Sequence, residues 1–274
     1  MKGSDDATGT SSSEGGVPLP PPPAATPDAV DDTVSGKVIS AEPVALVTGC
    51  RKGIGRHLAE HLLGAGYRVV GCGRTTEGWS AEHFDYRQAD VADEAQVLAL
   101  MRHISKTYGR LDVVINNAGL ASMNHSLLTP VSTVEKTLRA NVTGTFLVSR
   151  EAAKLMRKRK TGRIVNVSSA VVPLRLAGEA AYLASKSAVE TLSAVMAREL
   201  AEFGITVNVV APGPTATDMI RGVPKEKIAH LTEQFYNKRL TTVEDIANVV
   251  MFFLKAESFS VTGQVIYLNG VPNG

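Results

Sequence analysis

Short apolar runs recur along the chain from residue 44 onward, and longer amphipathic segments separate most of them. The runs predict strands at residues 44–47, 67–73, 84–89, 111–115, 163–167, 205–210 and 265–268. The segments between them predict helices at residues 56–63, 95–108, 181–203 and 243–255, and one or two helices within residues 131–159. Strands that alternate with helices predict an α/β fold built on a mostly parallel sheet.

Two stretches depart from this alternation. Residues 75–83 are polar and aperiodic, so we expect a connection too short for the usual crossover helix. Residues 1–40 are rich in Gly, Ser and Pro and lack apolar residues to bury, which predicts disorder. This segment has neither the apolar core of a secretory signal nor the arginines of a transit peptide. We favour a tether or an expression remnant over a polyproline ligand for a partner. One folded domain is therefore expected at residues 41–274.

Composition narrows the classes of function. The net charge is +2, the pI is near 8.5, and the Lys and Arg residues are scattered along the chain, so the charge pattern does not indicate nucleic-acid binding. We expect a small-molecule or carrier-borne substrate and no membrane span, since no apolar run approaches ~20 residues. The only cysteines, Cys50 and Cys72, are too few for a disulfide framework. This low cysteine content predicts a protein of the reducing cytoplasm. They lie at the ends of neighbouring predicted strands, so a redox switch is conceivable, although two inert thiols are favoured.

A glycine-rich turn follows the first predicted strand. It reads Thr48-Gly49-Cys50-Arg51-Lys52-Gly53-Ile54-Gly55 and leads into a helix. Strand, glycine turn and helix form a dinucleotide-binding arrangement, in which the helix N-terminus attracts phosphate. Gly49 permits the tight turn, and Gly53 and Gly55 allow the phosphate and the backbone to approach the helix N-terminus closely.

The end of the second predicted strand indicates the cofactor. A carboxylate there would bind a ribose 2′-hydroxyl and repel a 2′-phosphate, whereas this chain has Arg74, with Arg51 or Lys52 as helpers. The alternative is that all three are solvated surface charges. We therefore predict NADPH as the cofactor.

Other strand ends supply further candidate binding residues. Asp90-Val91 follows the third predicted strand, where the carboxylate could bind the adenine amino group, and Asn117-Ala118-Gly119 follows the fourth. The turn that begins Pro212-Gly213-Pro214 ends in hydroxyls that could hold a carboxamide. Those hydroxyls belong to Thr215 and Thr217. Residues 218–237 form an amphipathic segment, and we expect a substrate lid over about residues 214–237.

Tyr182 and Lys186 share one face of the helix predicted at residues 181–203, because they are four residues apart. A neighbouring ammonium favours the phenolate, so Lys186 is predicted to lower the pKa of Tyr182 and make it a general acid or base. Ser169 ends the preceding strand, where its hydroxyl would face the ligand crevice. Asn141 is a poor helix former within a helical region and predicts a local break.

Taken in order, these motifs resemble the short-chain dehydrogenase/reductase family over about residues 42–270. The resemblance implies a Rossmann-type, doubly wound sheet of seven mostly parallel strands in a single domain. It implies that Tyr182 protonates a ketone as NADPH delivers hydride, and that Lys186 also binds the nicotinamide ribose. Ser169 would steady the substrate oxygen and Asn141 would hold a proton-relay water. Thr217 and the Pro212-Gly213 turn would seat the nicotinamide. No metal is expected.

Within the family, the chain is most similar to 3-oxoacyl-[acyl-carrier-protein] reductases, on the run Val209-Val210-Ala211-Pro212-Gly213 and the start of the lid. That resemblance implies fatty acid biosynthesis and two basic residues that dock an acidic carrier protein. Their matching positions are Lys160 and Phe203, so the second charge is missing, although Arg157, Lys158 and Arg159 could compensate.

Three alternatives remain open. The chain could be a ketoreductase of secondary metabolism that acts on a polyketide, or a dihydrodiol-type dehydrogenase of a small cyclic alcohol, which Arg74 disfavours. It could also be a non-catalytic sensor of NADP, although Ser169, Tyr182 and Lys186 are all present. The apolar residues Val172, Leu174 and Leu176 suggest an acyl or aromatic substrate group. Family members are mostly tetramers, and the Ala-rich helix face at residues 188–201 predicts a homotetramer.

Overall fold

The strands form one sheet in the computed structural model, which describes residues 40–216 and 224–272. In chain order the strands are β1 (Val44–Thr48), β2 (Arg68–Gly73), β3 (Phe84–Gln88), β4 (Val113–Asn116), β5 (Gly162–Val167), β6 (Ile205–Ala211) and β7 (Val265–Tyr267). Their order across the sheet is β3-β2-β1-β4-β5-β6-β7. Every one of these pairings is parallel, which confirms the doubly wound, Rossmann-type fold.

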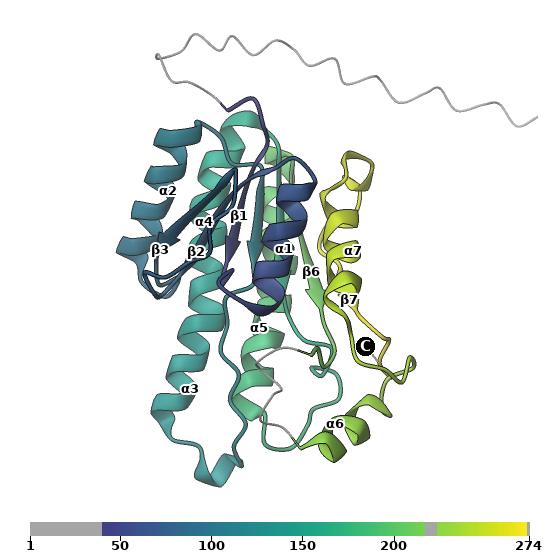
Figure 1. The fold of residues 1–274 in the computed structure, drawn as a ribbon. Helices are drawn as coiled ribbons and strands as arrows, with labels where there is room; N and C mark the ends of the chain where they lie inside the picture. Colours follow the sequence, from purple (N-terminus) through teal and green to yellow (C-terminus); the bar gives the residue numbers. More distant parts are fainter. Residues whose placement is uncertain (1–39, 217–223, 273–274) are drawn as a thin grey trace, which may run out of the picture. The chain divides into compact units, whose positions relative to one another are not determined.

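Helices cover both faces of this sheet (Figure 1). One face carries α1 (Gly53–Gly64) and α7 (Val243–Leu254). The other carries α2 (Glu94–Tyr108), α4 (Gly144–Met156) and α5 (Ala180–Leu200). Alternate strand residues enter the two cores: Leu46 packs on the α2 and α4 side and Val47 on the α1 and α7 side. Strands buried on both faces explain the near-continuous apolar runs in the sequence.

The elements near the carboxyl ends of the strands are α3 (Val131–Leu138), the π-helical turn η2 (Arg139–Thr143), α6 (Lys225–Thr232) and the 3₁₀ turn η1 (Ser126–Leu128) (Figure 1). Three further 3₁₀ turns precede strands along the chain: η3 (Arg157–Arg159) comes before β5, η4 (Ala201–Phe203) before β6 and η5 (Ala256–Ser258) before β7. None of the described helices combines the length and the apolar character that a membrane crossing needs. The segment predicted to be disordered lies outside the described residues apart from Ser40, as do Thr217 and residues 218–223 of the predicted lid.

No helix connects β2 to β3, as the aperiodic sequence predicts. Trp79 lies in this connection, and its ring stacks on Phe84 with 3.9 Å between the ring centroids. Its indole N–H donates to the Cys50 carbonyl in the glycine turn at 2.9 Å, and the Arg56 guanidinium lies 5.2 Å from the ring centroid. This short connection is therefore anchored to the glycine turn by a single aromatic side chain.

Candidate functional site

The four candidate catalytic residues come from three different elements. Ser169 follows β5, Tyr182 and Lys186 lie in the first two turns of α5, and Asn141 lies within η2. All of these elements meet at the carboxyl ends of the strands, which is where open α/β sheets bind ligands. Ser169, Tyr182 and Lys186 line one cavity of about 560 Å³.

Ser169 and Tyr182 are in direct contact, because the Ser169 hydroxyl hydrogen-bonds the Tyr182 phenol. The Lys186 ammonium is buried and donates to the Val167 carbonyl at 2.8 Å, and it lies 5.9 Å from the centroid of the Tyr182 ring. A hydroxyl, a phenol and an ammonium therefore converge where a substrate oxygen could bind.

The pKa values of this pair correct one expectation. Burial raises the pKa of Tyr182 to about 12. The hydrogen bond with Ser169 lowers this pKa without reversing the direction, and the charge of Glu179 adds to the rise. Burial also lowers the pKa of Lys186 to about 8. The prediction that Lys186 lowers the tyrosine pKa considered only their mutual attraction, whereas the larger effect is the cost of burying a charge on either side chain.

Asn141 sits at the predicted break, which the structure shows to be a π-helical turn. Its Oδ1 accepts from the Leu120 amide at 2.7 Å, and its Nδ2 donates to the Leu120 carbonyl at 2.9 Å and to Ser185 Oγ at 2.8 Å. Both N–H groups of the side-chain amide are therefore bonded to protein acceptors, and Oδ1 keeps one acceptor site beyond its bond with Leu120.

The glycine turn is shaped by contacts with the residues that follow β4. Gly49 has φ +66°, and Asn117 Nδ2 donates to the carbonyls of Thr48 and Gly49. A Cβ on Gly55 would lie 2.3 Å from Asn117 Nδ2 and 2.5 Å from the Gly49 oxygen. Gly55 is thus required by the close approach of the Gly49 backbone and the Asn117 side chain, which agrees with the backbone approach predicted for it, while the phosphate approach stays a prediction.

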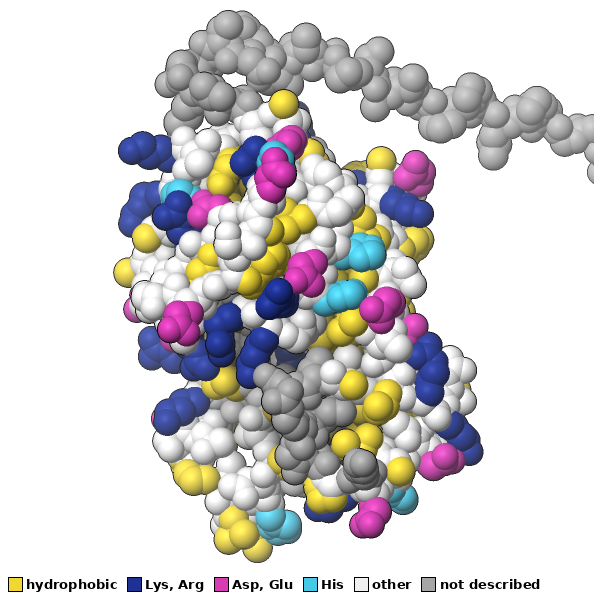
Figure 2. Space-filling model, viewed as in Figure 1, with side chains coloured by type: hydrophobic (Ala, Val, Ile, Leu, Met, Phe, Trp, Pro, Cys, Tyr) yellow, Lys and Arg dark blue, Asp and Glu magenta, His cyan; other side chains and the backbone are white. Residues whose placement is uncertain are grey.

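The N-terminus of α1 is suited to an anion. Its N-cap residue, Lys52, makes no side-chain capping hydrogen bond, and its first turn contains no acidic residue. Uncapped amides at a helix N-terminus bind phosphate, so this turn fits a dinucleotide. Arg51 and Arg74 are both exposed. Figure 2 shows several Lys and Arg side chains close together on the face of the molecule that it draws.

The other candidate binding residues have mainly structural contacts in the described part of the chain. Asp90 Oδ1 accepts from the Ala92 amide at 2.9 Å, and Val91 is buried. Thr48 Oγ1 accepts from the amides of Asn117 and Ala118. Ile54, Asn117, Gly119, Pro212, Gly213 and Thr215 line the same cavity as Tyr182.

Cys50 and Cys72 are both buried free thiols, and burial raises the pKa of each to about 12. The thiolate is the reactive form, so this environment favours the inert interpretation over a redox switch. Among the described residues, no group of three or more His, Cys, Asp or Glu is placed to hold a metal ion.

Several site residues escaped sequence reasoning. Ser185 holds Asn141, Glu179 lines the cavity, and Glu190 accepts from Ser168 Oγ at 2.5 Å. Ser185 and Glu190 lie three and eight residues after Tyr182, so helical spacing placed them near its face. That spacing alone does not separate buried partners from solvated ones.

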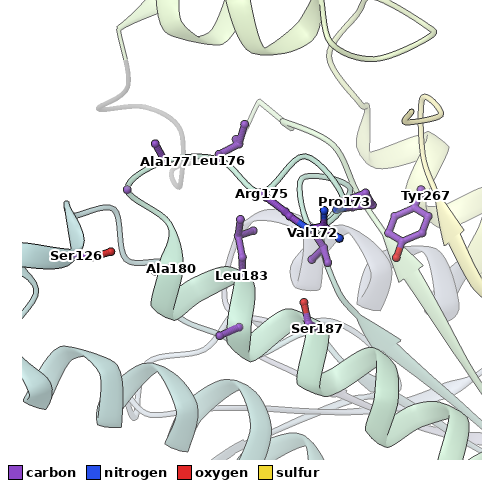
Figure 3. Close-up of a pocket in the computed structure, with 12 residues that line it drawn as sticks. Ser126, Val172, Pro173, Arg175, Leu176, Ala177, Ala180, Leu183, Ser187 and Tyr267 are labelled. Carbon is purple, nitrogen blue, oxygen red and sulfur yellow. The ribbon is translucent and has the colours of Figure 1, made fainter. Parts of the chain in front are cut away.

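A second cavity of about 500 Å³ lies on the outer side of the loop at residues 172–178 (Figure 3). Leu176 and Ala177 line both cavities, so this loop forms the wall between them. The outer cavity is also lined by Leu183 and Ser187 of α5 and by Tyr267 of β7.

Comparison with known proteins places this geometry in a family. A model of the short chain dehydrogenase family matches residues 43–228. The 3-oxoacyl-[acyl-carrier-protein] reductase FabG of Escherichia coli K12 is 34% identical over 234 residues, covering 83% of this chain and 96% of the relative. A short-chain type dehydrogenase/reductase of Picea abies is 35% identical over 247 residues, covering 83% and 91%.

Two solved structures extend the comparison. ElxO with NADP bound is 31% identical, with a TM-score of 0.77, and covers 83% of this chain and 99% of that chain. The aldohexose dehydrogenase of Thermoplasma acidophilum is 27% identical, with a TM-score of 0.78, and covers 84% and 94%. The chain belongs to the short-chain dehydrogenase family. It is an oxidoreductase of the class that acts on CH–OH and C=O groups.

Proposed function

We propose that this protein reduces a ketone to a secondary alcohol with NADPH, and that its substrate is a β-ketoacyl thioester. The observation that carries the proposal is the convergence of Ser169, Tyr182 and Lys186 in one cavity, next to a glycine turn suited to a dinucleotide. FabG relatives at 33–34% identity support the substrate class. NADP bound to ElxO supports the cofactor, as do the exposed side chains of Arg51 and Arg74, which would hold a 2′-phosphate in this proposal.

In this mechanism the substrate carbonyl oxygen binds between the hydroxyls of Ser169 and Tyr182. NADPH, when bound, supplies the hydride. Tyr182 is a protonated phenol at neutral pH, because burial raises its pKa to about 12, so it is ready to donate its proton to the developing alkoxide. The Lys186 ammonium then stabilises the phenolate that remains. Ser169 donates a hydrogen bond that holds the oxygen in place.

Other residues orient these groups. Asn141 fixes the chain after β4 through Leu120, and Ser185 ties that contact to α5. Gly49, Gly53, Ile54 and Gly55 would form the dinucleotide turn, and Asp90 and Val91 would hold the adenine. The residues that would hold the nicotinamide are Asn117, Ala118, Gly119, Pro212, Gly213 and Thr215. Thr217, proposed to bind the carboxamide, lies outside the described residues.

The carrier is a separate part of the proposal. The basic residues 157–160 and Phe203 lie where β5 and β6 begin, at the opposite end of the sheet from Tyr182. Tyr182 is near the start of α5, a helix of 21 residues that is about 30 Å long. This separation favours a second candidate, a reductase of carrier-free ketones in secondary metabolism, which needs no docking surface.

NADPH oxidation with β-ketoacyl groups offered on carrier protein, on coenzyme A and as simple esters tests both candidates, with NADH in parallel. Preference for the carrier-bound form supports the first candidate, and preference for esters or cyclic ketones supports the second. Cofactor binding without turnover of any ketone would contradict both and would support a non-catalytic sensor. A homotetramer is part of the proposal, because Phe146 and Val195 expose apolar side chains on α4 and α5, and a monomeric mass in solution would contradict it.

A further inference from the structure

Glu190 is a partly buried carboxylate that the proposed mechanism does not use. It lies one helical turn after Lys186 on α5. Its Oε1 accepts from Ser168 Oγ at 2.5 Å, and its Oε2 accepts from Tyr267 Oη at 2.8 Å. Both oxygens act as acceptors, which is the hydrogen-bonding pattern of an ionised carboxylate.

These two hydrogen bonds join three elements beside the catalytic groups. Ser168 immediately precedes Ser169, and its hydroxyl also lies 3.4 Å from the Lys186 carbonyl. Tyr267 belongs to β7, at the edge of the sheet. Glu190 therefore fixes the end of β5, from which Ser169 projects, against both α5 and β7.

Glu190 also affects the charge of Lys186. The Lys186 ammonium donates to the Val167 carbonyl, which is neutral, so this hydrogen bond places no negative charge next to the ammonium. The field of Glu190 raises the pKa of Lys186 and opposes the larger lowering that burial causes. Burial raises the pKa of Glu190, and its hydrogen bonds with Ser168 and Tyr267 and the field of Lys186 oppose this rise without reversing it. In the described part of the chain, the charged and titratable groups that face this pair are Tyr182 on α5 and Tyr267 on β7.

We propose that Glu190 is a positioning residue of this reaction, which keeps Lys186 cationic and fixes the strand end that carries Ser169. The inference rests on the proposed function, because it assigns Lys186 its charged role in ketone reduction. Tyr267 also lines the second cavity, as does Ser187 of α5 (Figure 3).

The decisive experiment compares Glu190→Gln with Tyr267→Phe. Glu190→Gln keeps the size of the side chain and removes its charge, whereas Tyr267→Phe removes one hydrogen bond and leaves the charge in place. We would measure kcat for ketone reduction from pH 6 to pH 9 with both variants and the unmodified enzyme.

The expected result follows from the pKa of Lys186, which is about 8. Below that pH the ammonium is charged, and loss of a nearby negative charge moves its titration to lower pH. Glu190→Gln should therefore lie within about twofold of the unmodified enzyme at pH 6 and about fivefold or more below it at pH 8. Tyr267→Phe should give the same small loss at every pH. Tyr182 does not titrate in this range, because its pKa is raised to about 12.

A loss in Glu190→Gln that is equal at all pH values, or no loss, would overturn the proposal. Glu190→Asp is the second variant: it retains the charge, so its pH profile should match the unmodified enzyme even if its rate is uniformly lower. A profile for Glu190→Asp that shifts like that of Glu190→Gln would also overturn the proposal.

One measurement separates this inference from the proposed function. NMR of protein with ¹³C-labelled lysine reports the titration of Lys186 directly, once Lys186→Met has assigned its signal. The midpoint should fall in Glu190→Gln even if the enzyme reduces none of the ketones tested. Absence of all turnover with a lowered midpoint would contradict the proposed function alone, whereas an unchanged midpoint contradicts the role of Glu190.

Discussion

The dinucleotide turn and the catalytic cluster lie at the same edge of the sheet but depend on different physical effects. In the turn, glycine conformation and backbone packing dominate: Gly49 needs its positive φ and Gly55 leaves no room for a Cβ. In the cluster, buried side chains dominate, and burial shifts the pKa values of Tyr182 and Lys186 in opposite directions. The comparison teaches that substitutions in the turn should act through steric fit, and those in the cluster through protons and charge.

The largest effect is expected from Tyr182→Phe. This change removes the proposed proton donor and leaves the ring that packs in the cavity, so kcat should fall by about 10² to 10⁴. Cofactor affinity, measured by calorimetry, should change little, because the turn is untouched. A rate within tenfold of the unmodified enzyme would show that the cluster does not depend on this proton.

Gly55→Ala should break the turn. The new Cβ would meet Asn117 Nδ2 at 2.3 Å and the Gly49 oxygen at 2.5 Å, so we expect a loss of about 3 kcal/mol in the free energy of unfolding and a loss of cofactor binding. Gly64→Ala at the end of the same helix is the matched control, since no atom lies within 4 Å of its Cβ position. Chemical denaturation checks both variants, and equal stabilities would refute the steric account.

Lys186→Met should separate stability from activity in the cluster. The pKa of Lys186 is lowered from 10.5 to about 8, so the folded protein holds this proton less tightly than the unfolded chain. Stability then rises as pH increases from about 8 to 10.5, and below that range burial of the charge is destabilising. Removing the charge should stabilise the fold by about 1–3 kcal/mol at pH 7 while it abolishes activity. Unfolding measured at pH 7 and pH 10 should show the gap narrowing, and a gap independent of pH would contradict this account.

Arg74→Ala should have the smallest effect and act only on cofactor choice. Loss of one charged hydrogen bond to a 2′-phosphate weakens NADPH binding by about tenfold and leaves NADH binding nearly unchanged. Arg102→Ala, an exposed arginine on α2, is the control and should change neither affinity. Equal weakening of both cofactors would mean that Arg74 supports the turn rather than the phosphate.

The strands, the helices and the glycine turn could be predicted because local patterns determine them. Buried strands such as β6 are continuous apolar runs, and Asn141 marked the π-helical turn because its side chain disfavours a regular helix. The connection with no helix between β2 and β3 was also visible as a polar, aperiodic stretch.

Burial and the pairing of polar groups could not be predicted in the same way. The raised pKa of Tyr182 depends on how completely the surrounding loops cover it, which no spacing along α5 expresses. Glu190 looks like a solvated helix residue until β7 places Tyr267 against it. These features arise from contacts between segments far apart in the chain, so the structure was needed to find them.

Trp79 has a practical consequence, because it is the only tryptophan in the chain. Its indole N–H bonds the glycine turn, and its ring stacks on Phe84. The tryptophan fluorescence of this protein therefore comes from one known position beside the dinucleotide turn. Its emission wavelength reports the polarity at that position, and its quenching reports any ligand that settles there, so occupancy can be followed in real time without a label.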